Sequence, residues 1–492
     1  MAIKYGYQAL AASEEMDGAK YKAILMQILR NLHYYIAPSF LQPRSNLPKK
    51  VHATSFLDGM RGVAAWIVLL SHYLVDVYPK ITFGWDTILG PHEYPKIRQG
   101  YGNPPPQPTD IFLQLPVIRV LISGNAMVQL FFVISGFSVS YRMVSLLRSG
   151  QQQRLMETVS SACFRRGFRL YLPIIAVMIT SELCAYYGYF NNYPSLLANP
   201  PPVNTVRGRV GHFVNLLDHL LGNEIWPKID AHGYNPQLWS IPVEFKGSLA
   251  IYATIIALMT TREKIRLTIE ASIVAYALYL GNTELSLFIT GMLLAELHHR
   301  KAERKQRESA NALPVKVEST FQYFPPTIRK RVPHWVPQVF WCAAAFLGIY
   351  ILSQPFNPIN TPGYKWLQVY SVSFLFRVNA WNVVGASLLV LAGDNCSIIE
   401  NIFTTPVAQY LGKISYASYL LHNTVIYAVR NPVMSWFERV MGVHELGTLV
   451  MLASLICAPV MIWAADLFTR YVDEPSISFA KWLFVKATKD ST

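Results

Sequence analysis

Charged residues and cysteines are scarce in this sequence. Only 15% of the 492 residues are charged, whereas soluble proteins average about 25%. Hydrophobic residues make up 52% of the chain, and the mean hydropathy is +0.25. This composition excludes an ordinary soluble enzyme and favours a chain that crosses a membrane several times. The five cysteines are scattered and none has a partner at metal-ligand spacing, which excludes a disulfide framework and a zinc site.

Several motifs of soluble enzymes are also missing. No serine lies in a nucleophile-elbow motif, and no glycine-rich phosphate loop follows a strand. We therefore expect no metal and no nucleotide-loop chemistry. The first 50 residues contain no early apolar core with a cleavage site, so we expect no secretory signal peptide and predict that the first span directs insertion.

The chain is strongly basic, with a formal net charge of +14 and a pI near 9.4. Nucleic-acid binding is not expected, because the basic residues follow the apolar segments along the chain instead of forming one patch. Most of them fall in segments that become cytoplasmic if both termini are cytoplasmic, as the positive-inside rule requires. The sequence therefore predicts cytoplasmic termini, in the endoplasmic reticulum or the plasma membrane.

Ten apolar segments are candidates for membrane spans. They are 62–79, 126–146, 170–190, 240–260, 267–282, 285–299, 338–353, 378–393, 413–430 and 447–470. Most approach the roughly 20 residues that a helix needs to cross a bilayer. The predicted fold class is all-α, a polytopic membrane helix bundle with about ten transmembrane helices. Two long outer loops, 80–125 and 191–239, are rich in proline and aromatic residues and are expected to roof a pocket.

Arg61 lies at the edge of the first predicted span, and His72 lies deep inside it. They are eleven residues apart, which is about three helical turns, so both lie on one face and roughly 16 Å apart along the axis. Ionisable residues inside a membrane are costly and are usually functional. Because histidine is the natural general base near neutral pH, His72 is a candidate catalytic base. Its alternative is a satisfied packing residue.

Glu244 is the second candidate catalytic residue. It lies about five residues, or roughly 8 Å, into its span from the outer side. We hypothesise that its carboxylate orients His72 and stabilises the protonated ring, as a carboxylate does in a hydrolase triad. The alternatives are an ion pair with Lys246 and a role in binding the acceptor.

Four arginines are candidate phosphate-binding residues at the cytoplasmic side: Arg61, Arg165, Arg166 and Arg169. Arginine forks suit phosphate recognition. Arg61 has a structural alternative, an i,i+3 ion pair with Asp58, and the other three satisfy the positive-inside rule in any case. Trp239 is most simply an interfacial aromatic residue. His422 is a candidate substrate-binding residue, or alternatively a hydrogen-bond partner of Asn423 or of a neighbouring helix. His298 and His299, beside Arg300, are expected at the surface.

The first-span segment, Leu57-Asp58-Gly59 followed by an arginine, ten residues and a histidine, resembles the hallmark of the acyltransferase 3 family of membrane O-acyltransferases. Other marks resemble the family's motifs and follow in the family's order. They are 128–137 in the second span, 164–173 at the third, 237–245 from Trp239 to Glu244, 411–422, and 473–476. The ordered set covers about residues 54–480.

This resemblance implies a membrane acyltransferase domain over 54–480, preceded by a cytoplasmic arm (1–53) and followed by a short cytoplasmic tail (481–492). It implies that acyl-coenzyme A, most simply acetyl-coenzyme A, is the co-substrate and binds near Arg61 and the third-span arginines. It also implies acyl transfer at His72 to a hydroxyl of a small metabolite or glycan, which approaches from the membrane lipid or from the outer side. It further implies that Trp239 is a substrate-binding residue in the wall of the pocket. The resemblance is to fungal-type members without an extracytoplasmic hydrolase-like domain.

Two other functions remain open at this point. A proton-coupled secondary transporter shares the polytopic frame and an intramembrane His/Glu pair, although no repeat relates the two halves. A catalytically inactive receptor or scaffold is the second alternative. Residues 21–40 form either an interfacial amphipathic helix or a disordered arm. The oligomeric state is not predicted.

Overall fold

Helices make up the regular structure of this protein. The computed structural model describes residues 26–27, 35–42, 52–86, 110–190, 205–222, 235–311, 333, 335–355, 361–369 and 378–489. No β-strand occurs among these residues, which confirms the predicted all-α fold class.

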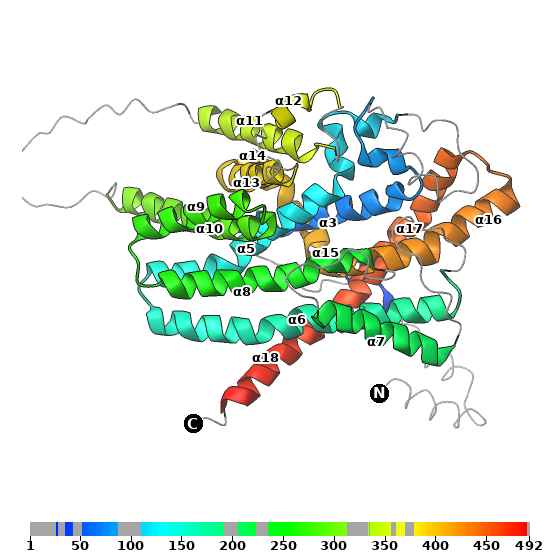
Figure 1. The fold of residues 1–492 in the computed structure, drawn as a ribbon, viewed down its shortest axis with the longest axis horizontal. Coiled ribbons are helices and arrows are strands. Elements are labelled where there is room, and N and C mark those ends of the chain that lie inside the picture. The colour runs from blue at the N-terminus through cyan, green and yellow to red at the C-terminus, as the bar shows by residue number, and fades with distance from the viewer. Residues whose placement is uncertain are drawn as a thin grey trace, which may run out of the picture.

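The helices follow one another along the chain as labelled in Figure 1. They are α3 (Ser55–Val75), α5 (Gly124–Arg148), α6 (Gln152–Tyr186), α7 (Val206–Gly222), α8 (Ser240–Leu258), α9 (Glu263–Tyr279), α10 (Thr283–Asn311), α11 (Trp335–Leu352), α12 (Lys365–Val369), α13 (Val378–Asn395), α14 (Ser397–Phe403), α15 (Pro406–Val425), α16 (Asn431–Met441), α17 (Leu446–Phe468) and α18 (Glu474–Lys489). Short helical segments are η1 (Ser39–Leu41), η2 (Pro79–Thr82), η3 (Phe112–Gln114), η4 (Ile118–Ile122), η6 (Pro236–Trp239), η7 (Ile426–Arg430) and η8 (Thr469–Asp473).

Several of these helices are long and apolar enough to cross a membrane. The five that meet this test are Gly124–Arg148, Gln152–Tyr186, Pro236–Leu258, Trp335–Leu352 and Leu446–Thr488. A sixth span results if the pair Ala380–Asn395 and Ser397–Phe403, bent by 101°, is counted as one. The protein is therefore a multi-pass membrane protein. Each of the ten predicted ranges overlaps a helix. The count of five or six spans by length and hydropathy is nevertheless lower than the predicted number of about ten. Helix α3 falls short because Asp58, Arg61 and His72 lower its mean hydropathy.

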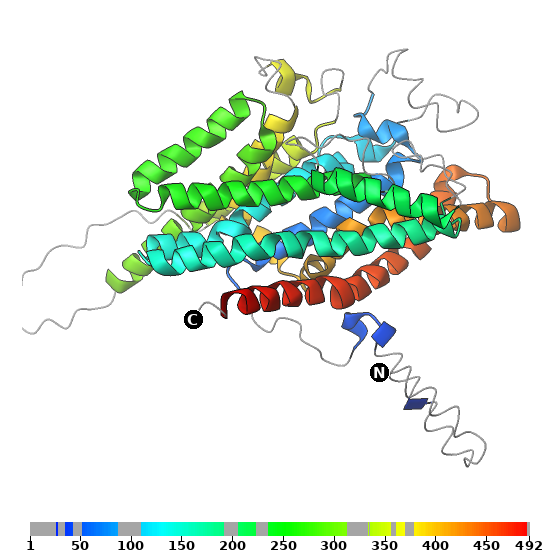
Figure 2. The same cartoon turned by 60° about the horizontal axis from the view of Figure 1, so that its bottom comes forward.

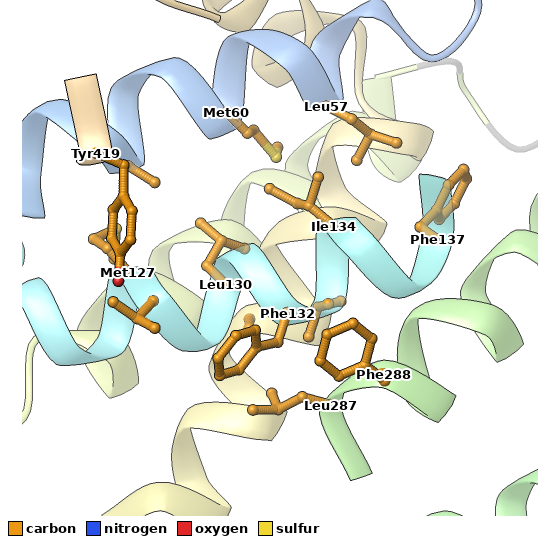
Figure 3. Packing of buried hydrophobic residues seen from close by; sticks show 14 of the residues in the cluster. Leu57, Met60, Met127, Leu130, Phe132, Ile134, Phe137, Leu287, Phe288 and Tyr419 are labelled. Atoms are coloured by element: carbon orange, nitrogen blue, oxygen red, sulfur yellow. The ribbon is translucent and has the colours of Figure 1, made fainter. Parts of the chain in front are cut away.

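Helix α3 lies inside the bundle. In Figure 1 it has α6 and α8 on one side and α11 and α13 on the other. Figure 2 gives the same order from another side, with the blue α3 behind α8 and α6. Figure 3 shows side chains of α3, α5 and α10 interdigitating in the core, among them Met60, Ile134, Phe137 and Phe288.

Two glycines let α3 and α15 touch backbone to backbone. A Cβ atom on Gly62 would lie 2.3 Å from the backbone nitrogen of Gly412, and one on Gly412 would lie 2.4 Å from the carbonyl oxygen of Asp58. Small residues permit this kind of close helix approach in membranes. Contacts along the pair advance in the same direction in both helices, so α3 and α15 are parallel. We call the end where both helices begin the Arg61 end, and the opposite end the Arg430 end.

The first predicted outer loop folds against the Arg430 end around Arg119. This side chain is 5% exposed and donates hydrogen bonds to carbonyl oxygens of Ile81, Thr82 and Gln354 at 3.2, 2.8 and 2.8 Å. Burial lowers the pKa of Arg119 to about 10, so the guanidinium stays charged at neutral pH and keeps all its donors. Arg119 thus joins three segments that are distant in the sequence. The rest of the two long loops, 87–109, 191–204 and 223–234, lies outside the described residues.

Residues 35–42 dock at the Arg61 end. The carboxylate of Asp466 in α17, which is fully buried, accepts hydrogen bonds from the backbone nitrogen and the hydroxyl of Ser39 at 2.9 and 2.6 Å. Arg470 donates to the carbonyl oxygen of Ala37 at 2.8 Å. This part of the predicted arm is therefore packed on the bundle; most of the predicted interfacial helix over 21–40 lies outside the described residues.

We predict that Gly62→Ala destabilises the protein. The three nearest atoms to the new methyl group all belong to the backbone of Leu411 and Gly412, so the two helices must move apart. Overpacking of this kind costs about 1–3 kcal/mol. Thermal unfolding in detergent measures the effect. Gly211→Ala in α7 is the matched control, because its Cβ would meet nothing within 4 Å. Equal unfolding midpoints for Gly62→Ala and the control would contradict the close crossing.

Candidate active site

The imidazole rings of His72 and His422 face each other between α3 and α15. Their ring centroids are 4.9 Å apart and the ring planes differ by 38°. The glycine contact sets this pairing, because Gly62 and Gly412 each precede the histidine of the same helix by ten residues. Two parallel helices that meet at these glycines must bring the histidines to the same level.

His422 is held in one orientation. Its Nδ1 lies 2.7 Å from the carbonyl oxygen of Tyr419. A carbonyl oxygen only accepts hydrogen bonds, so Nδ1 carries the hydrogen and Nε2 carries the lone pair. The residue is fully buried, and its Nε2 has no hydrogen-bond partner among the described residues. The site therefore contains a buried nitrogen that is ready to accept a hydrogen bond.

A network of buried polar groups surrounds His422. Gln237 donates to the carbonyl oxygen of Leu420 at 2.8 Å and accepts from the side-chain amide of Asn423 at 2.6 Å. The hydroxyl of Tyr419 lies 2.7 Å from the hydroxyl of Ser240 and donates to the carbonyl oxygen of Gln237 at 3.0 Å. These bonds tie η6 and the start of α8 to the last turns of α15, so the backbone that orients His422 is fixed.

Glu244 does not contact His72. Its Oε1 accepts a hydrogen bond from the hydroxyl of Ser135 in α5 at 2.6 Å and forms an ion pair with Arg166 in α6. Arg166 also donates through Nε to the hydroxyl of Ser248 at 2.9 Å. The structure therefore does not show the predicted contact between Glu244 and His72; the carboxylate contacts Ser135 and Arg166 instead. Axial position alone did not reveal that an arginine and a serine lie nearer to this carboxylate than the imidazole does.

The arginines differ in what they contact. Arg61 forms the predicted ion pair with Asp58 at 2.7 Å, and both side chains are exposed enough to meet solvent. Arg169 is also exposed, and it interacts electrostatically with Arg61, Arg166 and Asp473. Arg165 donates through Nε to the carbonyl oxygen of Ser161 in its own helix at 3.0 Å. The guanidinium groups of Arg61 and Arg169 therefore form an accessible positive region at the Arg61 end, next to the carboxylates of Asp58 and Asp473. Arg166 is instead paired with Glu244.

Trp239 ends η6, two residues after Gln237. It is half-buried, and its ring meets that of Phe132 in α5 edge to face, with centroids 6.3 Å apart. The side chain thus belongs to the wall between α5 and α8.

These features agree with a comparison to known protein families. The sequence model of the acyltransferase 3 family, described as an acyltransferase domain, matches residues 54–470. The chain belongs to this family. The match covers Arg61, His72, Glu244 and His422, and it favours an acyltransferase over the transporter that the sequence left open.

Fungal acyltransferases are similar over nearly the whole chain. The protein is 27% identical over 474 residues to O-acetyltransferase PaAT-1 of Phomopsis amygdali, which covers 91% of this chain and 88% of the relative. It is 24% identical over 467 residues to acyltransferase R4 of a Phoma species, and over 473 residues to acyltransferase clz18 of Cochliobolus lunatus. Each of these two alignments covers 87% of this chain and 95% of the relative. No solved structure matches.

Some polar contacts of this acyltransferase were not found from its sequence. His298 and His299 are half-buried, which corrects the expectation that they lie at the surface. His298 Nδ1 lies 2.6 Å from the carboxylate of Asp394. His299 donates through Nε2 to the backbone carbonyl oxygen of Tyr141 at 2.9 Å, because a carbonyl oxygen can only accept. Both pairs tie α10 to neighbouring helices. The equal Gly-to-His spacing of 62/72 and 412/422 is the signal that would have found the histidine pair.

We predict that Glu244 and Arg166 contribute to stability as a unit. Removing one partner of a buried ion pair leaves an uncompensated charge and costs about 3–5 kcal/mol, whereas replacing both by apolar residues costs much less. Thermal unfolding of Glu244→Leu, Arg166→Leu and the double variant tests this coupling. Arg300→Leu is the control, because its pair with Glu263 at 3.6 Å is exposed and is worth at most about 1 kcal/mol. Additive losses in the double variant would contradict the pairing.

Proposed function

We propose that this acyltransferase moves an acetyl group from acetyl-coenzyme A to a hydroxyl of a small metabolite or a glycan. The observation that carries the proposal is the order of side chains along α3. An accessible positive region with Arg61 and Arg169 lies at one end, and the His72–His422 pair lies about three turns, or roughly 16 Å, further on. A donor with charged phosphates and a long, flexible, uncharged arm suits this order.

In this proposal the Arg61 end faces the cytoplasm, and both termini are cytoplasmic. Acyl-coenzyme A is available on that side, in either the endoplasmic reticulum or the plasma membrane. The phosphates bind Arg61 and Arg169, with Arg165 close by in the same turns of α6, because arginine forks match phosphate oxygens. Glu244 contributes by holding Arg166, which keeps α5, α6 and α8 together behind the phosphate site.

The chemistry of the proposal takes place at His72. Its ring nitrogen accepts the proton of the acceptor hydroxyl while the oxygen attacks the thioester carbonyl carbon. The new C–O bond forms, the C–S bond breaks, and the thiolate of coenzyme A leaves with the proton from the imidazolium. None of these steps requires a metal.

The acceptor meets the thioester beside Trp239 and His422 in this proposal. The relative named as an O-acetyltransferase supports a hydroxyl as the acceptor group. The wall contributed by Phe131, Phe132 and Trp239 is aromatic, which suits a hydrophobic hydroxylated metabolite such as a terpenoid or polyketide. A glycan or glycolipid is the alternative acceptor.

We predict that His72→Ala abolishes acetyl transfer. Loss of a general base lowers the rate about 10²–10⁴-fold. Membranes that contain the wild type are given acetyl-coenzyme A labelled in its acetyl group, together with a pool of host metabolites. They should release free coenzyme A and label a product. His444→Ala is the matched control, because His444 lies exposed between α16 and α17. Acetyl-coenzyme A that neither binds nor reacts with the wild type would overturn the proposal in favour of a transporter.

We also predict that Arg169→Gln weakens donor binding. A hydrogen bond to a charged group is worth about 1.5–3 kcal/mol, so KM for acetyl-coenzyme A should rise about tenfold to a hundredfold. Acetylpantetheine lacks the phosphates of the nucleotide end, and turnover of this donor should not change. Arg142→Gln, an exposed arginine of α5, is the control. Equal losses with both donors would show that Arg169 acts on the fold and not on phosphate.

A further inference from the structure

A base that works inside a membrane bundle needs a partner for the positive charge that it gains. Three carboxylates on the helices around His72 are already held by cations. Glu244 of α8 pairs with Arg166, Asp76 of α3 pairs with Arg430 at 3.4 Å, and Glu182 of α6 pairs with His212 and lies 3.7 Å from Arg209. Among the described residues, no carboxylate contacts either imidazole of the histidine pair.

The group that does face His72 is the ring of His422. Its Nδ1–H is committed to the carbonyl oxygen of Tyr419 at 2.7 Å, so the lone pair is on Nε2. That atom is buried and lacks a hydrogen-bond partner among the described residues. A buried acceptor without a donor costs free energy and requires an explanation. The ring centroids are 4.9 Å apart, so His72 is the imidazole nearest to this lone pair and is close enough to be its donor.

The backbone around His422 is built to keep this lone pair in place. The side chain of Gln237 holds the carbonyl oxygen of Leu420 and the amide of Asn423. Tyr419, whose carbonyl oxygen accepts from His422, is fixed through its hydroxyl by Ser240 and Gln237. The orientation of His422 therefore does not depend on His72, and His422 can impose an orientation on its neighbour.

We propose that His422 is a positioning residue for the transfer reaction: its Nε2 accepts a hydrogen bond from His72, fixes the tautomer of that ring and shares its positive charge. The inference rests on the proposed function of the same site. It gives His422 a role through His72 in place of the carboxylate that the sequence had suggested.

The proton balance follows from this arrangement. One nitrogen of His72 keeps its hydrogen and donates it to Nε2 of His422. The other nitrogen has the lone pair and takes the proton of the acceptor hydroxyl as the C–O bond forms. When the C–S bond breaks, that proton goes to the departing thiolate of coenzyme A. His422 ends the cycle as it began, neutral and bonded to Tyr419.

Two variants of His422 test the inference by kinetics. His422→Leu removes the acceptor, so kcat should fall about tenfold to a hundredfold, while KM for acetyl-coenzyme A stays within about twofold. The acidic limb of the kcat profile should move to lower pH, because the protonated His72 ring loses the neighbour that favours it. His422→Gln retains an acceptor and should restore part of kcat. A folded His422→Leu protein with wild-type kcat and pH profile would overturn the inference.

Nitrogen NMR of the protein labelled in histidine provides a readout that does not depend on activity. In the wild type the ¹⁵N signals of His72 should show one tautomer, and in His422→Leu they should show a mixture, with the spectrum partly restored in His422→Gln. If His72 has one tautomer but no acetyl transfer occurs, the inference stands and the proposed function fails. If transfer occurs and the His72 signals are identical in the wild type and His422→Leu, the function stands and the inference fails.

Discussion

The contact between Gly62 and Gly412 determines the geometry of the candidate site. At this point α3 and α15 meet through backbone atoms, so the relative height and rotation of the two helices cannot change without separating them. The histidine ten residues further along each helix is then brought to the same level, which explains the ring separation of 4.9 Å between His72 and His422. The distance between Arg61 and His72 is set by α3, which carries both residues. Two small residues thus set the position of the histidine pair relative to Arg61.

The sequence predicted the fold class and named candidate site residues, but it did not reveal which side chains they contact. Hydropathy placed the ten apolar ranges, each of which overlaps a helix, but it missed α7, α16 and α18, which are amphipathic or polar. The Arg61–His72 spacing required only the periodicity of one helix. Glu244 was different, because its nearest groups, Ser135 and Arg166, come from two other helices, and no pattern within one segment shows how three helices pack. His422 was found as a candidate, whereas its pairing with His72 needed the parallel packing of helices that lie about 350 residues apart in sequence.

Several carboxylates inside the bundle of this acyltransferase are neutralised by partners other than the His72–His422 pair. Carboxylates such as Glu244, Asp76 and Asp466 are each paired with an arginine or capped by hydrogen-bond donors, as buried charges must be. The imidazoles are left facing each other without an acid. A neutral pair of this kind suits a bundle in which a permanent charge is expensive. Arg61 and Arg169 remain accessible at the end of the bundle, where anionic groups of a donor can reach them.

A structure of the protein with coenzyme A bound, determined by electron cryomicroscopy, tests the account most directly. The account predicts phosphate density within hydrogen-bonding distance of Arg61 and Arg169, with the pantetheine arm running along α3 and the thiol beside His72. It also predicts that His422 Nε2 lies within hydrogen-bonding distance of a His72 ring nitrogen. Coenzyme A bound at the Arg430 end, or histidine rings separated by another side chain, would contradict it.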